Sequence, residues 1–374
     1  MDVVVKERGS CVKLPLENPN PDIDRFIRVI KGEEIPKKPP FVELFLDGEV
    51  YREIAVNFLD REWVEPRDRR SLKAYWDNIV YVQYKMGYDY VRVSGGLDFP
   101  GKSRIGEDTA GELSRGKRGW VEEGVGVISS WEDYEKYPWP DPQKADLSAY
   151  EHVANNLPEG MGIFVCPSSG FLEIPLDTLF GYENLAFLLY DNPELVKAVF
   201  DRVGNILYRF YEQLIGLPHL VGFFQGDDMG FKTSTMISPN DLRKYSLPWH
   251  KKLANLAHEN GLIYMLHSCG NIDSIMEDLI YDVKIDAKHS FEDEATPVIE
   301  FKQKYGDKIG VLGGIDMDKL CRLEENDLRA YVRNVLDRCM PGGRYALGSG
   351  NTVANYVPLK NYFIMLDEGL KWGN

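Results

Sequence analysis

Residues 220–270 read LVGFFQGDDMGFKTSTMISPNDLRKYSLPWHKKLANLAHENGLIYMLHSCG, and this stretch contains the unit from which the fold can be predicted. An apolar run, a polar segment, a helical stretch and a second apolar run follow one another at residues 220–225, 226–238, 239–260 and 262–267. Pro239 directly after Ser238 is typical of a helix start, and Gly261 is typical of a helix end. The stretch therefore predicts two parallel strands joined by a helical crossover.

The same alternation recurs along the chain and predicts eight strands. They fall at residues 41–46, 89–93, 161–166, 220–225, 262–267, 284–288, 308–312 and 344–347. Eight such units favour closure into an α/β (β/α)8 TIM barrel, with an open doubly wound sheet as the alternative. We expect a single barrel domain over residues 1–374. It carries an N-terminal extension, residues 1–38, with a helix near residues 21–31, and a long loop, residues 100–142, over the barrel mouth.

Composition narrows the class of protein. The chain of 374 residues has 44% hydrophobic and 28% charged residues, which is typical of a globular protein with a large core. Its net charge of −15 argues against a nucleic-acid partner, while a few local arginines could still hold a small anionic substrate. The N-terminus has no apolar signal region, and no apolar run is long enough to span a membrane. Five widely spaced cysteines predict reduced thiols, so we expect a cytoplasmic protein.

Polar residues gather where the predicted strands end. In a barrel of this kind the functional groups come from the C-terminal ends of the strands. We expect substrate contacts there from Asp47, Ser94, Ser168, Tyr182, His289, Asp316 and Ser349. The fourth strand ends in Asp227 and Asp228, and the fifth in His267 and Cys269.

His267 and Cys269 are candidate zinc ligands. Residues two apart in an extended segment project to the same side, and imidazole with thiolate is a ligand pair that zinc prefers. The third ligand would be Asp227, Asp228, His289 or a substrate atom. The alternative is a hydrogen-bonded histidine beside a cysteine that only packs. Asp227 and Asp228 cannot both face the barrel interior, so we expect one to be a general acid or base and the other to accept loop hydrogen bonds. The alternative is that both are solvated loop aspartates.

Several stretches together resemble the uroporphyrinogen-decarboxylase superfamily. They are GDDMGFKTSTMISPNDLRKYSLPWHKKL at 226–253, LIYMLHSCGNIDSIMEDLI at 262–280, KIGVLGGIDMDKL at 308–320, WEDYEKYPWPDP at 131–142, CPSSGFLEIPLDTLFGYENL at 166–185 and DNPELVKAVF at 191–200. The resemblance covers about nine-tenths of the chain. It implies a (β/α)8 barrel and either decarboxylation of a tetrapyrrole or methyl transfer with a corrinoid protein.

Two departures from the family pattern separate these activities. True decarboxylases of the superfamily carry an arginine-rich motif after the first strand, where this chain reads LDGEVYREI with Asp47 and Glu49. The methyltransferase branch binds zinc through a His-x-Cys motif and a later cysteine. His267 and Cys269 match the first part, but Ser349 stands near the position of the later cysteine. The resemblance therefore favours a methyltransferase whose third zinc ligand is a carboxylate or His289.

The sequence thus predicts a methyltransferase that moves a methyl group between a small methylated compound or thiol and a corrinoid held by a partner protein. Zinc at His267 and Cys269 would act as the Lewis acid, with Asp227, Asp228 and His267 as the catalytic residues. One alternative is a metal-free carboxy-lyase acting on a tetrapyrrole or another carboxylic acid, which arginines such as Arg92, Arg104 and Arg344 converging on the cleft would favour. The other is a barrel that binds without catalysis.

Overall fold

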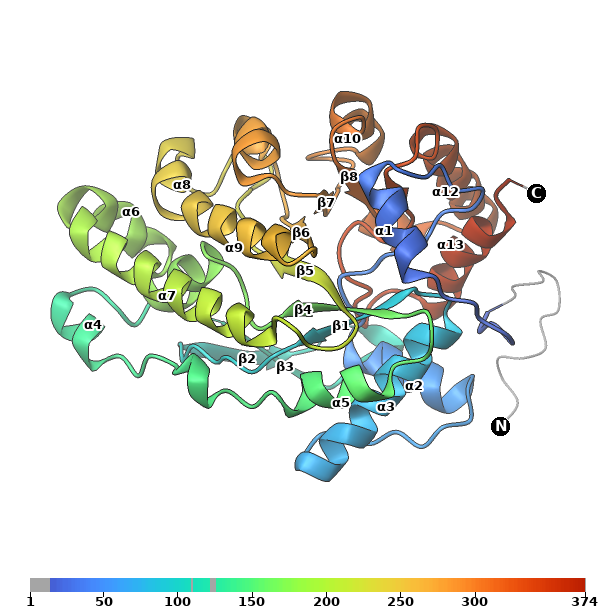
Figure 1. Ribbon diagram of the computed structural model, residues 1–374, viewed down its shortest axis with the longest axis horizontal. Helices are drawn as coiled ribbons and strands as arrows, with labels where there is room; N and C mark the ends of the chain where they lie inside the picture. Colours follow the sequence, from blue (N-terminus) through green and yellow to red (C-terminus); the bar gives the residue numbers. More distant parts are fainter. Residues whose placement is uncertain (1–13, 109, 122–125, 374) are drawn as a thin grey trace.

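A curled parallel sheet of seven strands forms the centre of the molecule (Figure 1). The computed structural model describes residues 14–108, 110–121 and 126–373. The strands lie in the order β1-β4-β5-β6-β7-β8-β9, and each pairs in parallel with its neighbours. Their bounds are β1 Tyr90–Ser94, β4 Gly162–Cys166, β5 Leu220–Gly226, β6 Ile263–His267, β7 Ala287–His289, β8 Gly310–Leu312 and β9 Tyr345–Ala346. Parallel order places all the C-terminal strand ends at one edge of the sheet.

Helices surround this sheet, as Figure 1 shows. They are α1 Ile23–Lys31, α2 Gly48–Asn57, α3 Arg69–Lys85, α4 Trp131–Lys136, α5 Ser148–Asn156, α6 Tyr182–Asp191, α7 Pro193–Leu214, α8 Pro239–Tyr245, α9 Leu247–Glu259, α10 Val298–Tyr305, α11 Met317–Arg322, α12 Glu325–Cys339 and α13 Leu359–Lys371. Short helical turns lie at η1 Gly111–Leu113, η2 Pro142–Lys144, η3 Ile174–Phe180, η4 Asp273–Ile275 and η5 Asp278–Val283. Within the described ranges, no helix has both the length and the apolar content that a membrane span needs.

Residues 41–46 do not form the eighth strand that the sequence predicts. They make two isolated parallel bridges to the chain near β9, which join Phe41 to Leu347 and Leu46 to Val353. On the side of β1, the hydroxyl of Tyr90 donates to the carbonyl of Glu43 (2.6 Å) and accepts from its N–H (2.9 Å). A side chain thus occupies the backbone groups that a ladder with β1 would need. The other seven predicted strands are confirmed in the described part of the chain.

The inner face of the sheet changes from apolar to polar along the strands. Side chains alternate in direction, so Tyr90 and Arg92 share one face of β1, and Met265 and His267 share one face of β6. The apolar half is a buried cluster made of Phe26, Ile30, Val42, Leu44, Tyr90, Phe164, Phe224, Ile263, Met265, Ala287, Leu312 and Ala346. Two of these belong to α1, which confirms the helix predicted near residues 21–31. Residues 1–13 of the predicted extension, with Cys11, lie outside the described residues.

The helix predicted over residues 239–260 is interrupted. It divides into α8 and α9 at Ser246, and Pro248 lies in the first turn of α9. A proline has no N–H for the carbonyl four residues before it, and its ring crowds that carbonyl. The break brings the hydroxyl of Ser246 within 3.4 Å of a carboxylate oxygen of Asp227.

The long segment over residues 100–142 is more ordered than the predicted loop. It contains an antiparallel hairpin of β2 Ser103–Glu107 and β3 Lys117–Val121, followed by α4, while residues 109 and 122–125 lie outside the described part. Arg115 attaches the hairpin to the start of α2 through Asp47 (3.3 Å) and Glu49 (2.9 Å). Asn355 donates to Asp108 at 2.8 Å. The hairpin is therefore anchored next to the C-terminal edge of the sheet.

Candidate metal centre and substrate cleft

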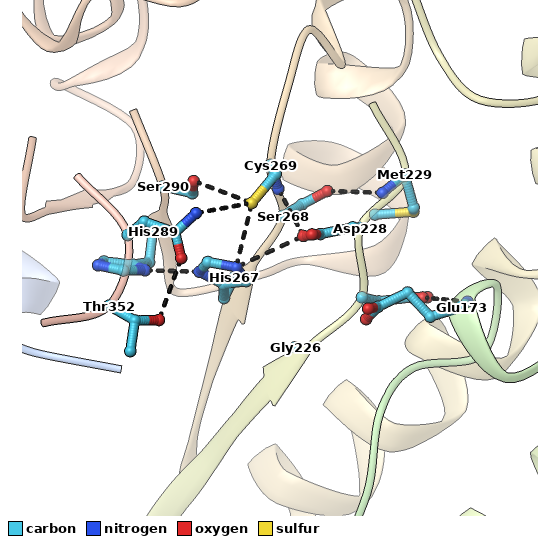
Figure 2. A network of polar contacts seen from close by, with 12 residues as sticks. Glu173, Gly226, Asp228, Met229, His267, Ser268, Cys269, His289, Ser290 and Thr352 are labelled. Atoms are coloured by element: carbon cyan, nitrogen blue, oxygen red, sulfur yellow. Dashed lines mark hydrogen bonds and ion pairs between the residues drawn. The ribbon is translucent and has the colours of Figure 1, made fainter. Parts of the chain in front are cut away.

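Three side chains with metal-binding atoms meet where β5 and β6 end (Figure 2). One ligand atom each from Asp228, His267 and Cys269 lies within 4.8 Å of the other two. Nε2 of His267 is 3.4 Å from Sγ of Cys269 and 3.4 Å from Oδ1 of Asp228. The sheet register places them together, because Gly226 of β5 pairs with His267 of β6. A carboxylate, an imidazole and a thiol at one point form a donor set suited to zinc.

The charges at this cluster depend on its hydrogen bonds. Burial opposes ionisation of Asp228, but His267 and the N–H of Cys269 (2.7 Å) lower the pKa of this carboxyl to about 2. Burial, reinforced by the Asp228 carboxylate, raises the pKa of the Cys269 thiol. The amide of Asn351 donates to Sγ at 3.2 Å, and Ser290 Oγ lies 3.5 Å away. The thiol becomes a strong ligand when a bound cation displaces its proton.

His289 holds the ring of His267 from behind. The two Nδ1 atoms are 2.7 Å apart. Burial lowers the pKa of His289 well below its usual range, so this ring is neutral and can accept an N–H. While Nδ1–H donates to His289, Nε2 of His267 lies next to Asp228 and Cys269, where a bound cation would take the place of the proton that this nitrogen directs at Asp228. Metal-ligating histidines usually have such a second partner.

The two adjacent aspartates point to different places. Asp227 is fully buried, and its carboxylate accepts from His250 Nε2 (2.7 Å) and from the backbone N–H groups of Leu172 and Glu173 (both 2.9 Å). A Cβ on Gly170 would lie 2.1 Å from Cγ of Asp227, so only glycine fits at that position. Asp227 thus fixes the loop after β4, and Asp228 is the aspartate that lies beside His267.

A cleft of about 590 Å³ opens beside the cluster, a volume typical of small-molecule sites. Its polar lining includes Asp228, His267, Glu173 and Arg92. The rest of this lining is mostly apolar and aromatic, and the aromatic wall of the cleft is made of Leu44, Phe45, Leu46, Tyr51, Tyr75, Trp76 and Ile79. Burial, with Asp228 and Asp227 nearby, raises the pKa of Glu173 to about 8. The cleft therefore combines charged and polar side chains with a large apolar surface.

Two of the seven residues predicted to bind substrate line this cleft, namely Ser94 and Ser168. The other five are not in its described lining. Asp47 forms an ion pair with Arg115, and the half-exposed Tyr182 donates to the carbonyl of Met236. His289 is hydrogen-bonded to His267, and Ser349 donates to Glu43. Asp316 accepts from the backbone N–H of Lys319 at the start of α11. Each of these side chains has at least one protein partner, so position at a strand end alone does not place a residue in the cleft.

The arginines do not converge. Arg92 lines the cleft, whereas Arg344 lies at the start of β9 and its Nη1 is 3.5 Å from the carbonyl of Ile30, and Arg104 belongs to the β2–β3 hairpin. Sequence reasoning missed Glu173 and the aromatic wall. Glu173 lies in a segment without periodic pattern, and the wall combines residues 41–46 with α2 and α3, which are brought together only by folding.

Fold and site define an α/β protein with a cleft of about 590 Å³ and a cluster of candidate metal ligands at the C-terminal edge of a curled parallel sheet. The family model of uroporphyrinogen decarboxylase (URO-D) matches residues 128–371, and the chain belongs to this family. Among curated proteins, no sequence matches the chain.

Two solved structures align with most of the chain. A methyltransferase from Methanosarcina mazei aligns with a TM-score of 0.66 and 15% identity over 93% of this chain and 97% of its own. A Listeria monocytogenes protein described as a candidate vitamin-B12-independent methionine synthase aligns with a TM-score of 0.48 and 14% identity. This alignment covers 90% of this chain and 98% of the Listeria protein. At 15% identity the likeness to the Methanosarcina protein is one of fold alone.

Proposed function

We propose that this protein is a zinc-assisted methyltransferase that moves a methyl group between a small methylated compound or thiol and a corrinoid carried by a separate protein. The observation that carries the proposal is the cluster of Asp228, His267 and Cys269 beside the cleft. Likeness in fold to the Methanosarcina methyltransferase supports it.

The donor set fits zinc in number and in charge. Three protein ligands with one open position are typical of catalytic zinc. Asp228 and the Cys269 thiolate together offset the two positive charges of the ion. Asp228 and His267 line the cleft, so a cation held by these residues would be accessible to a substrate in that space. Bound there, zinc supplies Lewis acidity that lowers the pKa of a thiol or polarises a leaving oxygen.

The residues of the chain position these groups. His289 accepts the Nδ1 proton of His267 and fixes the direction of Nε2. Asn351 orients the Cys269 sulfur, and the backbone N–H of Cys269 holds Asp228. Asp227, predicted as a catalytic residue, acts in this proposal on the loop after β4 through Leu172 and Glu173 and not on the substrate.

A carboxy-lyase that acts on a tetrapyrrole remains the second candidate, favoured by the family and by the raised pKa of Glu173. One arginine in a cleft of this volume is a poor match for a polycarboxylate, which needs several cations. We further propose that residues 41–46 complete a (β/α)8 barrel as a short eighth element, supported by the Phe41 and Leu46 bridges.

Elemental analysis of the full chain, purified without chelators and then supplied with zinc, tests the metal. We expect about one zinc per chain, and loss of most of it in Cys269→Ser and Asp228→Asn. Cys321→Ser is the matched control, since this half-buried cysteine lies in α11 and should leave the zinc content unchanged. Far less than one zinc per wild-type chain after zinc addition would overturn the proposal and favour the metal-free lyase, which turnover of uroporphyrinogen would then support.

A further inference from the structure

Arg92 is a cation in the cleft that the proposed metal chemistry does not use. It lies on the inner face of β1, and its Nε donates to the carbonyl of Phe224 at 3.1 Å. Its two Nη groups have no hydrogen-bond partner among the described residues, and no described carboxylate lies within 4.0 Å of its guanidinium. A guanidinium held at one edge, with both terminal nitrogens free, is prepared to bind a ligand through those nitrogens.

The surroundings of Arg92 reduce its contact with water. Its Cζ atom is 5.7 Å from the ring centroid of Phe224 and 6.0 Å from that of Phe45. Guanidinium is weakly hydrated and stacks well on aromatic rings. Its planar end matches the two oxygens of a carboxylate, which it binds through two parallel hydrogen bonds.

The carboxylates of the described cleft lining do not neutralise the positive charge of Arg92. A zinc ion at the cluster is neutralised by its own two anionic ligands, Asp228 and Cys269. Glu173 is the remaining carboxylate in the described lining, and it makes no ion pair with Arg92. An anionic group that enters the cleft therefore meets its attractive partner at Arg92.

The apolar wall determines what else the ligand carries. Phe45, Tyr51, Tyr75 and Trp76 line the same cleft as Arg92 and His267, and the Phe45 ring lies 6.0 Å from Cζ of Arg92. Aromatic side chains of this kind bind flat apolar bodies, and a few placed polar groups fix the orientation. A ligand that contacts both Arg92 and the aromatic wall has an aromatic or alicyclic body and a charged end.

We propose that Arg92 is the specificity-determining residue of the cleft and that the substrate is a small aromatic or alicyclic carboxylate. The carboxylate pairs with the free Nη groups, the ring lies on the aromatic wall, and the reacting group extends toward Asp228, His267 and Cys269. This inference rests on the proposed function for the reaction, but the binding itself does not require zinc.

Calorimetric titration with two probes tests it, benzoate and its neutral isostere benzamide. Wild-type protein should bind benzoate at least about tenfold more tightly than benzamide, since a charged, partly desolvated pair is involved. Arg92→Gln should remove this preference while its zinc content stays that of the wild type. Arg92→Lys keeps the positive charge but loses the planar guanidinium. Its preference for benzoate over benzamide should lie between those of the wild type and Arg92→Gln.

Controls separate the two proposals. Cys269→Ser should lose zinc yet keep the preference for benzoate, so a failed zinc proposal does not by itself remove the carboxylate site. A Trp76→Leu variant should weaken both probes by similar factors. Thermal denaturation confirms that the variants fold. Equal affinity of wild-type protein for benzoate and benzamide, or an unchanged preference in folded Arg92→Gln, would overturn the proposal and leave Arg92 as a support for β5 through Phe224.

Discussion

The Nδ1 atoms of His267 and His289 lie 2.7 Å apart, so one imidazole donates to the other inside the sheet. β6 and β7 pair these two residues in register, and both project to the inner face. A neutral His289 is the acceptor that leaves Nε2 of His267 free for a cation. The proposed metal centre therefore depends on a residue that does not touch the metal.

Replacement of His289 by phenylalanine should weaken zinc binding by about 10- to 100-fold, as is typical when the second partner of a ligating histidine is lost. The ring volume is kept, so the His267 orientation is the property that changes. Competition with a zinc chelator measures the affinity. His152→Phe is the control, because this histidine binds Asp77 on the protein surface. Equal zinc affinity in His289→Phe and wild type would contradict this role.

Asp227 and Asp228 should differ in their effect on stability. Asp227→Ala leaves the buried His250 and two backbone N–H groups without their acceptor and should lower the free energy of unfolding by about 3–5 kcal/mol. Asp228 has a side chain that is 39% exposed, so Asp228→Asn should reduce zinc content with little loss of stability. Urea denaturation with the zinc removed measures the unfolding free energy of both variants. A larger loss of stability in Asp228→Asn than in Asp227→Ala would contradict the structural role of Asp227.

Glu43 should make the protein less stable as pH rises. Burial raises the pKa of Glu43 to about 8, opposed by hydrogen bonds from Ser349, while an unfolded glutamate titrates near 4.5. Between pH 4.5 and about pH 8 the folded state holds a proton on Glu43 that the unfolded state has released. The free energy of unfolding therefore falls by up to about 1.4 kcal/mol per pH unit as pH rises through this window. The contribution of Glu43 to stability is greatest below pH 4.5.

Glu43→Gln removes the titration and keeps an oxygen that can accept from Ser349. Urea denaturation at pH 5, 6, 7 and 8 should show a difference in unfolding free energy, wild type minus Glu43→Gln, that declines as pH rises. A difference that does not vary with pH would mean that Glu43 titrates normally in the folded protein.

Arg115 should control local opening of the β2–β3 hairpin more than global stability. Exposed ion pairs contribute little to unfolding free energy, so Arg115→Ala should change it by about 1 kcal/mol or less. Loss of the contacts to Asp47 and Glu49 should speed amide hydrogen exchange in β2 and β3. Lys117→Ala, an exposed change in the same hairpin, is the control. Unchanged exchange in Arg115→Ala would show that other contacts hold the hairpin.

Local patterns were sufficient to predict the seven strands of the sheet, because alternation of apolar runs with helical stretches depends on neighbours in sequence. They also indicated His267 and Cys269 as a ligand pair, since residues two apart in an extended segment share a side. The predicted eighth strand failed at Glu43, whose backbone groups bond the hydroxyl of Tyr90, a residue 47 positions away.

The sequence by itself determined the parallel α/β architecture, the family and the residue types at the strand ends, because these follow from composition, periodicity and local motifs. Only the tertiary structure distinguished the surroundings of Asp227 from those of Asp228, since these depend on where His250 and the loop at Gly170 lie. It also brought Arg92 into one cleft with aromatic side chains from other elements, while Asp47 and Ser349 bind protein partners. Long-range contacts determine which polar side chains are satisfied within the protein and which remain free for a ligand.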